Sequence, residues 1–169
     1  MINSNINIDK AGWSFDNTYS KLPDDLSVKQ VPIPVKSPEL IILNKDLSED
    51  LNLDFTHIKV ENLSQLFSGN LLPTGSESIA QAYAGHQFGH FTMLGDGRAV
   101  LIGEHVSKNG DRYDIQFKGS GKTPFSRSGD GRAALGPMLR EYIVSEAMHR
   151  LGVATTRSLA VVKTGENVI

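Results

Sequence analysis

Two strand-forming runs joined by an Asn-Gly pair constrain the fold of this chain more than any other feature. The runs cover residues 99–106 and 112–118, and Asn109-Gly110 lies between them. Asn and Gly accept the positive φ angles of a tight hairpin turn more readily than other residues. This order therefore predicts an antiparallel pair of strands.

A helix is predicted over residues 137–151, after a loop at 119–136 that contains five Gly and one Pro. Pro137 suits the first helical position, and Gly152 suits the position just past the end. A strand at 158–163 should follow, and a further strand should begin at 168, so we expect the chain to be truncated there. Strands on both sides of one helix predict an α+β unit, an antiparallel sheet with one packed helix, much like a protein-kinase N-lobe.

The first 70 residues have a different character, with aromatic residues among polar ones and a Pro-rich stretch at 31–34. Such a sequence predicts irregular, extended chain. Trp13, Phe15 and Tyr19 are expected to anchor it on the domain. We expect a short strand at 40–43 and a short helix at 78–83. The predicted organisation is an N-terminal wrap-around segment at 1–70 and a kinase-like N-lobe at 71–169, truncated before a C-lobe.

Charge and composition exclude several function classes. The chain of 169 residues has a net charge of −2, so it lacks the excess of Lys and Arg that nucleic-acid and membrane surfaces require. No apolar run approaches the roughly 20 residues that span a bilayer, and residues 1–10 lack the order of a signal peptide. We therefore expect a cytoplasmic protein. The absence of cysteine excludes disulfides and thiolate metal sites within these residues.

The tetrapeptide Gly-Asp-Gly-Arg occurs twice, at 95–98 and at 129–132, on either side of the predicted hairpin. The glycines would let the backbone approach a ligand closely, and the arginine could hold phosphate oxygens through two N–H groups. The alternative is a tight turn, since Asp-Gly is a favoured turn pair. Both interpretations stay open on the residues alone.

Lys118 ends the second strand, where it could supply positive charge to the phosphates of a nucleotide or be an ordinary solvated edge charge. Glu141 lies on the predicted helix among apolar neighbours and has no cation three or four residues away. It is therefore predicted to face inward and to need a partner from elsewhere in the fold. Glu146 has Arg150 at i+4 and is expected to form a surface pair with it. Lys118 with Glu141 would reproduce the strand-lysine and helix-glutamate pair of protein kinases.

Two other motifs are rejected. Residues 119–123 suggest a P-loop, but Gln116 stands where that pattern requires glycine, and Pro and Gly residues would break the helix that must follow. His86 and His90 have the i, i+4 spacing of metal ligands, yet Gln87 occupies the place of the zincin glutamate. We expect both histidines to be structural.

A series of short motifs extends over most of the chain beyond residue 73. They are YAGHQFG at 83–89, LGDGR at 94–98, FKGSG at 117–121, PFSR at 124–127, GDGRA at 129–133, RE at 140–141, SEAMH at 145–149 and TTR at 155–157. In this length and order they closely resemble the selenoprotein O family, whereas the first 70 residues resemble it only loosely.

The resemblance implies a kinase-like fold that holds ATP in reverse orientation and, with Mg²⁺ or Mn²⁺, transfers AMP to Ser, Thr or Tyr hydroxyls of protein substrates. The nucleotide-binding positions that it implies are Gly95, Gly97, Arg98, Lys118, Asp130 and Gly131. It pairs Glu141 with Lys118. It also puts the catalytic aspartate and the metal ligands beyond residue 169, so we expect no catalytic or metal-binding residue in this chain and an inactive fragment. Kinase-type phosphotransfer and a nucleotide-binding module without catalysis remain the alternatives.

Overall fold

The hairpin predicted around Asn109-Gly110 is the central feature of the fold. In the computed structural model, which describes residues 8–87 and 89–168, strand β5 (Ala99–Val106) pairs antiparallel with strand β6 (Arg112–Lys118). Gly110 has a φ of +87°, a left-handed conformation that glycine adopts at little cost. The two strands, their bounds and their antiparallel pairing are therefore confirmed.

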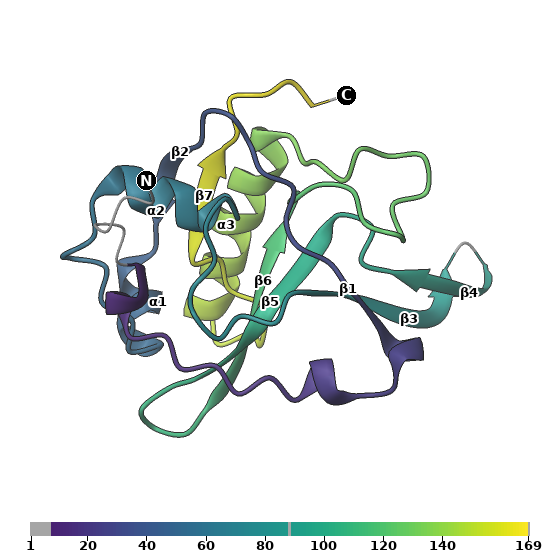
Figure 1. The fold of residues 1–169 in the computed structure, drawn as a ribbon, viewed down its shortest axis with the longest axis horizontal. Helices are drawn as coiled ribbons and strands as arrows, with labels where there is room; N and C mark the ends of the chain where they lie inside the picture. The colour runs from purple at the N-terminus through teal and green to yellow at the C-terminus, as the bar shows by residue number, and fades with distance from the viewer. Residues whose placement is uncertain (1–7, 88, 169) are drawn as a thin grey trace.

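Further strands extend the sheet on the other side of β5. Strand β3 (Ile79–Gln87) pairs antiparallel with β5, with β1 (Ser27–Lys29) and with β4 (His90–Gly95). The order across this five-stranded sheet of the described residues is β1-β3-β5-β6, with β4 beside β3. Figure 1 shows β3 and β4 reaching away from the rest of the molecule on the right of the view. The result is one antiparallel layer.

The helix predicted at 78–83 is wrong, because most of these residues lie in β3. The segment contains Ala and Gln, which favour helices, and its short apolar run shows no clear period. In the fold, Gln81 lies opposite Ser27 of β1, and Ala82 lies opposite Gly95 of β4. Pairing with strands that are distant in the sequence thus overrides the local preference.

The predicted helix after the loop is confirmed as α3 (Leu135–Arg150), with its start two residues earlier than expected and its end one residue earlier. Pro137 lies in its first turn, where backbone N–H groups have no partner within the helix. Gly152 follows the last turn with a φ of +77°, and its N–H donates to the carbonyl of His149 at 3.0 Å. Among the described residues, no helix is long and apolar enough to cross a membrane.

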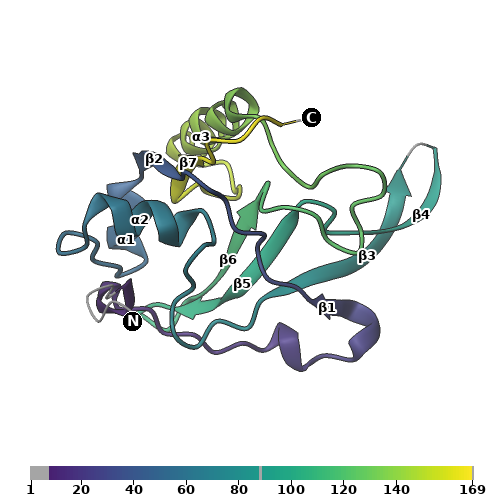
Figure 2. The same ribbon diagram turned by 45° about the horizontal axis from the view of Figure 1, so that its top comes forward.

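A second, two-stranded sheet joins two distant parts of the chain. Strand β2 (Glu39–Leu43) pairs antiparallel with β7 (Ala160–Lys163). Strands were predicted at 40–43 and 158–163, but not their pairing with each other. Helix α3 lies beside β7, as the views in Figures 1 and 2 both show. The fold is therefore α+β, with antiparallel strands and a packed helix, as predicted for a kinase-like N-lobe.

The first 70 residues contain helices that the sequence analysis did not predict. Helices α1 (Lys45–Asp50) and α2 (Val60–Phe67) follow β2, and three short 3₁₀ helices precede β1. The side chain of Asn44 caps α1 by accepting a hydrogen bond from the backbone N–H of Leu47 at 3.1 Å. With six and eight residues, α1 and α2 are too short to show a full apolar repeat in the sequence.

The chain that precedes β1 lies along strand β5. Ser14 and Asp16 form backbone hydrogen bonds of 2.8 and 3.0 Å with this strand, and Phe15 forms a β-bridge with His105. The ring of Trp13 stacks on that of Phe15 at 5.6 Å between centroids, and both rings pack against the core. The predicted anchoring role of these two aromatic residues is confirmed.

The core lies between the hairpin and the N-terminal segment. It consists of the buried side chains of Ile8, Ala11, Leu47, Leu51, Leu53, Phe55, Leu63, Leu66, Phe67, Val100, Ile102 and Ile115. Ile115 and the partly buried Phe117 point from β6 into this core. Because side chains alternate along a strand, Gln116 and Lys118 point to the opposite face of the sheet.

Candidate functional site

Lys118 and Glu141 meet where the hairpin ends beside helix α3. Lys118 is the last residue of β6, and Glu141 lies on the second turn of α3. The Lys118 Nζ atom lies 2.7 Å from each carboxylate oxygen of Glu141. The pair places the charge of Lys118 at the strand end, where it could meet an anion.

The prediction that Glu141 faces inward is wrong. Its side chain is 50% exposed, and that of Lys118 is 40% exposed. Helix α3, whose sixteen residues are all described, buries Ser145 alone. The apolar positions around Glu141 therefore do not form a buried stripe, because the helix lies at the edge of the structure with a polar side chain, Ser145, at its most buried point.

Both Gly-Asp-Gly-Arg segments lie close to this strand end. The loop that follows β6 folds back, and the Gly119 N–H donates to the carbonyl of Arg98 at 2.6 Å. The Gly121 N–H donates to the carbonyl of Gly131 at 3.1 Å. The segments 95–98 and 129–132 are thus linked through residues 119–121, next to Lys118.

The glycines of these segments make room for the chain itself. A Cβ atom on Gly95 would lie 2.3 Å from the ring of Phe125, and one on Gly97 would lie 2.9 Å from the Phe125 carbonyl oxygen. Gly131 has a φ of +72°, and a Cβ there would lie 2.1 Å from the carbonyl oxygen of Gly121. The turn interpretation accounts for these close approaches without a ligand.

Two hydroxyl side chains fasten the loop to the first Gly-Asp-Gly-Arg turn, and the sequence analysis missed both. The buried Thr123 donates its hydroxyl to the carbonyl of Asp96 at 2.5 Å, and the buried Ser126 donates to the carbonyl of Gly97 at the same distance. The Ser126 hydroxyl oxygen also accepts from the Thr123 N–H at 2.7 Å. Hydroxyl residues are common in turns, so their type alone carried no signal for this role.

Asp96 was also missed as a residue that shapes the site. Its Oδ2 atom accepts hydrogen bonds from the Gln81 N–H at 3.1 Å and from the Gln116 side-chain amide at 3.3 Å. Partial burial raises the pKa of Asp96 above its ordinary value, although the hydrogen bond from Gln81 opposes this shift. Asp96 therefore ties its turn to β3 and to the face of β6 that carries Lys118.

The charged residues of the two segments differ in what they contact. Arg98 is exposed and forms no side-chain hydrogen bond or ion pair with any residue that the structure describes. Arg132 is mostly buried and donates to the carbonyl of Ile33 at 3.2 Å, so it holds the N-terminal segment. A side-chain oxygen of Asp130 accepts from the Arg132 N–H at 2.8 Å. Arg98 and Lys118 are thus two cations of this region that could turn toward an anion.

The first histidine of the rejected metal motif lies in an exposed part of the sheet. His86 lies on the exposed β3–β4 hairpin, where its ring packs edge-on against Phe91 at 5.7 Å between centroids. Within residues 8–87 and 89–168, no group of three or more His, Cys, Asp or Glu side chains could hold a metal ion.

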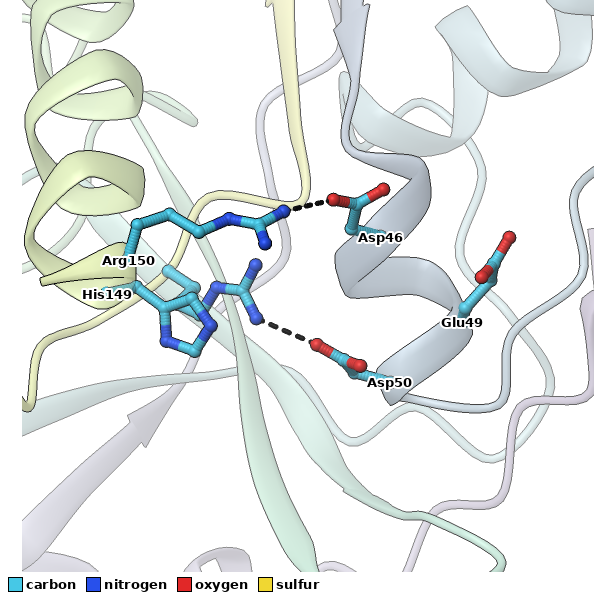
Figure 3. Close-up of a pocket in the computed structure, with 6 residues that line it drawn as sticks. Asp46, Glu49, Asp50, His149 and Arg150 are labelled. Carbon is cyan, nitrogen blue, oxygen red and sulfur yellow. Dashed lines mark hydrogen bonds and ion pairs between the residues drawn. The ribbon is translucent and has the colours of Figure 1, made fainter. Parts of the chain in front are cut away.

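The predicted pair of Glu146 with Arg150 is wrong. Glu146 instead binds Arg157, with 2.7 Å between Oε2 and Nη2, and Arg150 reaches across to Asp46 of α1. Figure 3 shows this contact between α1 and α3, at the rim of a hollow of about 360 Å³. The i+4 spacing allowed the predicted pair, but partners from other parts of the fold replace it.

Comparison with known proteins gives consistent results over nearly the whole chain. The family model described as protein adenylyltransferase SelO matches residues 11–169. A protein nucleotidyltransferase YdiU from Pelagibacter ubique is 72% identical over 158 residues, which cover 94% of this chain and 33% of the relative. Proteins of the same name from Nitrosococcus oceani and Geobacillus kaustophilus are 65% and 62% identical, over 93% and 94% of this chain and 32% and 33% of theirs. The chain spans about a third of the length of these curated relatives.

Proposed function

This chain belongs to the SelO family of protein adenylyltransferases, and on that premise we propose that the full-length protein uses ATP to transfer AMP to Ser, Thr or Tyr hydroxyls of other proteins. In this reaction the hydroxyl oxygen forms a bond to the α-phosphorus of ATP. The bond from that phosphorus to the oxygen that bridges to the β-phosphate breaks. Pyrophosphate leaves, and the hydroxyl proton is released.

The observation that carries the proposal is the Lys118–Glu141 pair at the end of the hairpin. Its two 2.7 Å contacts hold the ammonium group beside the turn that contains Arg98. Two cations at one strand end suit the phosphates of a nucleotide, whose charge must be neutralised as the leaving group departs. The residues proposed to contact ATP are Gly95, Gly97, Arg98, Lys118, Asp130 and Gly131.

In this proposal the glycines shape the phosphate-binding turn, and they do not serve only to make room for the ligand. Because Gly95 and Gly97 already accommodate Phe125, the nucleotide would contact their turn on the side away from that ring. Thr123 and Ser126 would then keep the turn in shape through their hydrogen bonds to its carbonyl groups. The expected contribution of this region is a rigid phosphate-binding turn.

A divalent ion, Mg²⁺ or Mn²⁺, is part of the proposed activity, and it would neutralise phosphate charge when bound. The described residues do not fit such a centre, because they include no cluster of three or more ligand side chains. We therefore derive no step through the ion. The resemblance to the family implies ligands and a catalytic aspartate beyond residue 169, and on this basis we propose that residues 1–169 alone do not transfer AMP.

A second candidate function is transfer of the γ-phosphoryl group, because protein kinases use the same type of lysine and glutamate pair. Labelled ATP separates the two reactions in the full-length protein. AMP transfer predicts that substrate protein retains label from α-labelled ATP and not from γ-labelled ATP. Retention of the γ label alone would refute it. ATP binding with neither label retained would instead support a nucleotide-binding module without catalysis.

The remaining features of the proposal concern partners, location and organisation. We propose ATP and hydroxyl-bearing proteins as partners, with no nucleic acid or membrane surface, in line with the net charge of −2. We also propose a cytoplasmic location. The division into a wrap-around segment at 1–70 and a kinase-like N-lobe at 71–169 remains our proposal for the organisation of the chain.

A further inference from the structure

Helix α3 carries Glu141, and its apolar side chains are at most partly buried. Of its sixteen residues, all of them described, only Ser145 is buried. The Lys118–Glu141 pair is about half exposed, and pairs of this kind hold side chains only weakly. Other contacts must therefore help to fix the rotation of α3 about its axis.

The contacts that can do this centre on Arg157, in the segment between α3 and β7. Its Nε and Nη2 atoms lie 3.0 and 2.7 Å from the two carboxylate oxygens of Glu146 on α3. Its Nη1 atom lies 2.9 Å from Oδ2 of Asp50, the last residue of α1. We call these three residues, Arg157, Glu146 and Asp50, the α3 anchor.

Within the α3 anchor, the Arg157–Glu146 pair is better shielded from water than the Arg150–Asp46 pair, whereas Asp50 is 61% exposed. The side chains of Arg157 and Glu146 are 14% and 18% exposed, whereas those of Arg150 and Asp46 are 70% and 67% exposed. Shielded charges hold their partners more firmly, because water screens them less and the geometry of a forked pair is fixed. Figure 3 shows the side chains of Arg150 and Asp46 reaching toward one another from α3 and α1.

Other hydrogen bonds connect the α3 anchor to the core of the fold. Hydrogen bonding from Arg157 lowers the pKa of Glu146 although partial burial opposes it, and hydrogen bonds from Asn44 and Ser158 act in the same direction. Asn44 also caps α1, and its side-chain amide donates to the carbonyl of Ser158 at 3.2 Å. Helix α1 in turn buries Leu47 in the core. Glu146 thus lies beside a part of the structure that is itself fixed.

Glu146 and Glu141 constrain different sides of the helix. Five residues of α-helix correspond to a rise of about 7.5 Å and a rotation of roughly 140°. A carboxylate at about 6 Å from the helix axis would move by about 2 Å if the helix turned by roughly 20°. Such a movement would break a 2.7 Å contact between Lys118 and Glu141.

We propose that Arg157 is a positioning residue for nucleotide binding. Through Glu146 and Asp50 it fixes the rotation of α3, and so it holds Glu141 against Lys118. This inference rests on the proposed function for its effect on activity. Its structural part, the control of α3 by Arg157, stands on the contacts alone.

A double-mutant cycle in the full-length protein tests this role. Arg157→Met should lower kcat/KM for ATP in AMP transfer about tenfold, and Arg157→Lys should lower it less. In a Glu141→Gln background, Arg157→Met should cause no further loss beyond about twofold, because the residue acts through Glu141. An equal loss in both backgrounds would overturn the proposal, since it would indicate a general effect on folding. Arg150→Met is the matched control, and a tenfold loss there would also overturn it.

Amide hydrogen exchange separates this inference from the proposed function. Arg157→Met should increase exchange in α3 around Glu141 more than Arg150→Met does, even if the protein proves to have no transferase activity. Unchanged exchange in α3 would refute the structural part. If Arg157→Met does not fold, Asp50→Asn removes one of the two partners, and the same two measurements apply to it.

Discussion

Replacement of Lys118 by alanine should separate the stability of this protein from its nucleotide binding. The Lys118–Glu141 pair is 40% and 50% exposed, and an ion pair of this exposure contributes about 0 to 1 kcal/mol to the free energy of unfolding. For a domain of this size, such a loss lowers Tm by about 4 °C or less. The variant should therefore fold normally.

The effect on ATP should be much larger. A charge-assisted hydrogen bond from the ammonium group to a phosphate contributes about 1.5 to 3 kcal/mol, which corresponds to a change of about 10- to 150-fold in Kd. Transfer of AMP should be abolished if Lys118 must also neutralise charge during the reaction. Isothermal titration calorimetry with ATP and thermal unfolding, both on the full-length protein, measure the two effects.

Lys21 offers a control away from this strand end, because it forms an ion pair of 3.6 Å with Asp16 and both side chains are more than half exposed. Lys21→Ala should change Tm by a similar small amount and leave the Kd for ATP within about twofold. An unchanged Kd in Lys118→Ala would remove Lys118 from the site. A loss of binding accompanied by a much larger fall in Tm would show that the residue acts on folding instead.

Two further predictions concern the stability of the fold. Glu104 is buried and accepts hydrogen bonds from the Thr18 and Tyr19 N–H groups at 2.5 and 2.6 Å, so Glu104→Gln should lower the free energy of unfolding by about 2 to 4 kcal/mol in urea titrations. Burial raises the pKa of Glu104, but these hydrogen bonds outweigh it and the net pKa is lowered. The contribution of the Glu104 carboxylate to the free energy of unfolding is therefore complete above its unfolded pKa of about 4.3, and it is lost as the pH falls through its folded pKa. The Glu104→Gln variant should not show this loss. Gly131→Ala would place a Cβ 2.1 Å from the Gly121 carbonyl oxygen at a positive φ, so we expect a loss of about 2 kcal/mol or more, and an unchanged Tm would contradict the observed packing of the loop.

Residues that favour turns and helix ends predicted the elements that depend on neighbouring residues in the sequence. Asn109-Gly110 located the hairpin because the turn has a positive φ at Gly110, and Pro137 with Gly152 located α3 to within two residues. Residues 78–83 were misassigned because their strand is stabilised by pairing with β1 and β4. No pattern within the segment indicates this pairing. The pairing of β2 with β7, separated by more than a hundred residues, was hidden for the same reason.

In the candidate site, too, the sequence predicted some residues and not those whose role depends on distant parts of the chain. The sequence indicated Lys118 and Glu141, because one ends a strand and the other is an acidic residue on a helix without a nearby cation. It could not indicate that Thr123 and Ser126 fasten the loop, since that depends on the backward fold of residues 119–131. The partner of Glu146 was misassigned because Arg150 satisfied the helical spacing, while Arg157 competes from beyond the helix with a better shielded, forked contact.

The chain segment at residues 14–16 has a consequence for how this protein behaves in solution. Strand β5 pairs with β3 at Leu101. Nearer the end of β5, on the same side, its backbone groups form hydrogen bonds with Ser14 and Asp16 instead. Without this segment, those groups would form an open strand edge that could pair with another molecule. A shortened chain that starts after residue 20 would keep every residue proposed to contact ATP, yet it should associate into larger species. We therefore expect residues 14–16 to protect the protein against association through this strand edge.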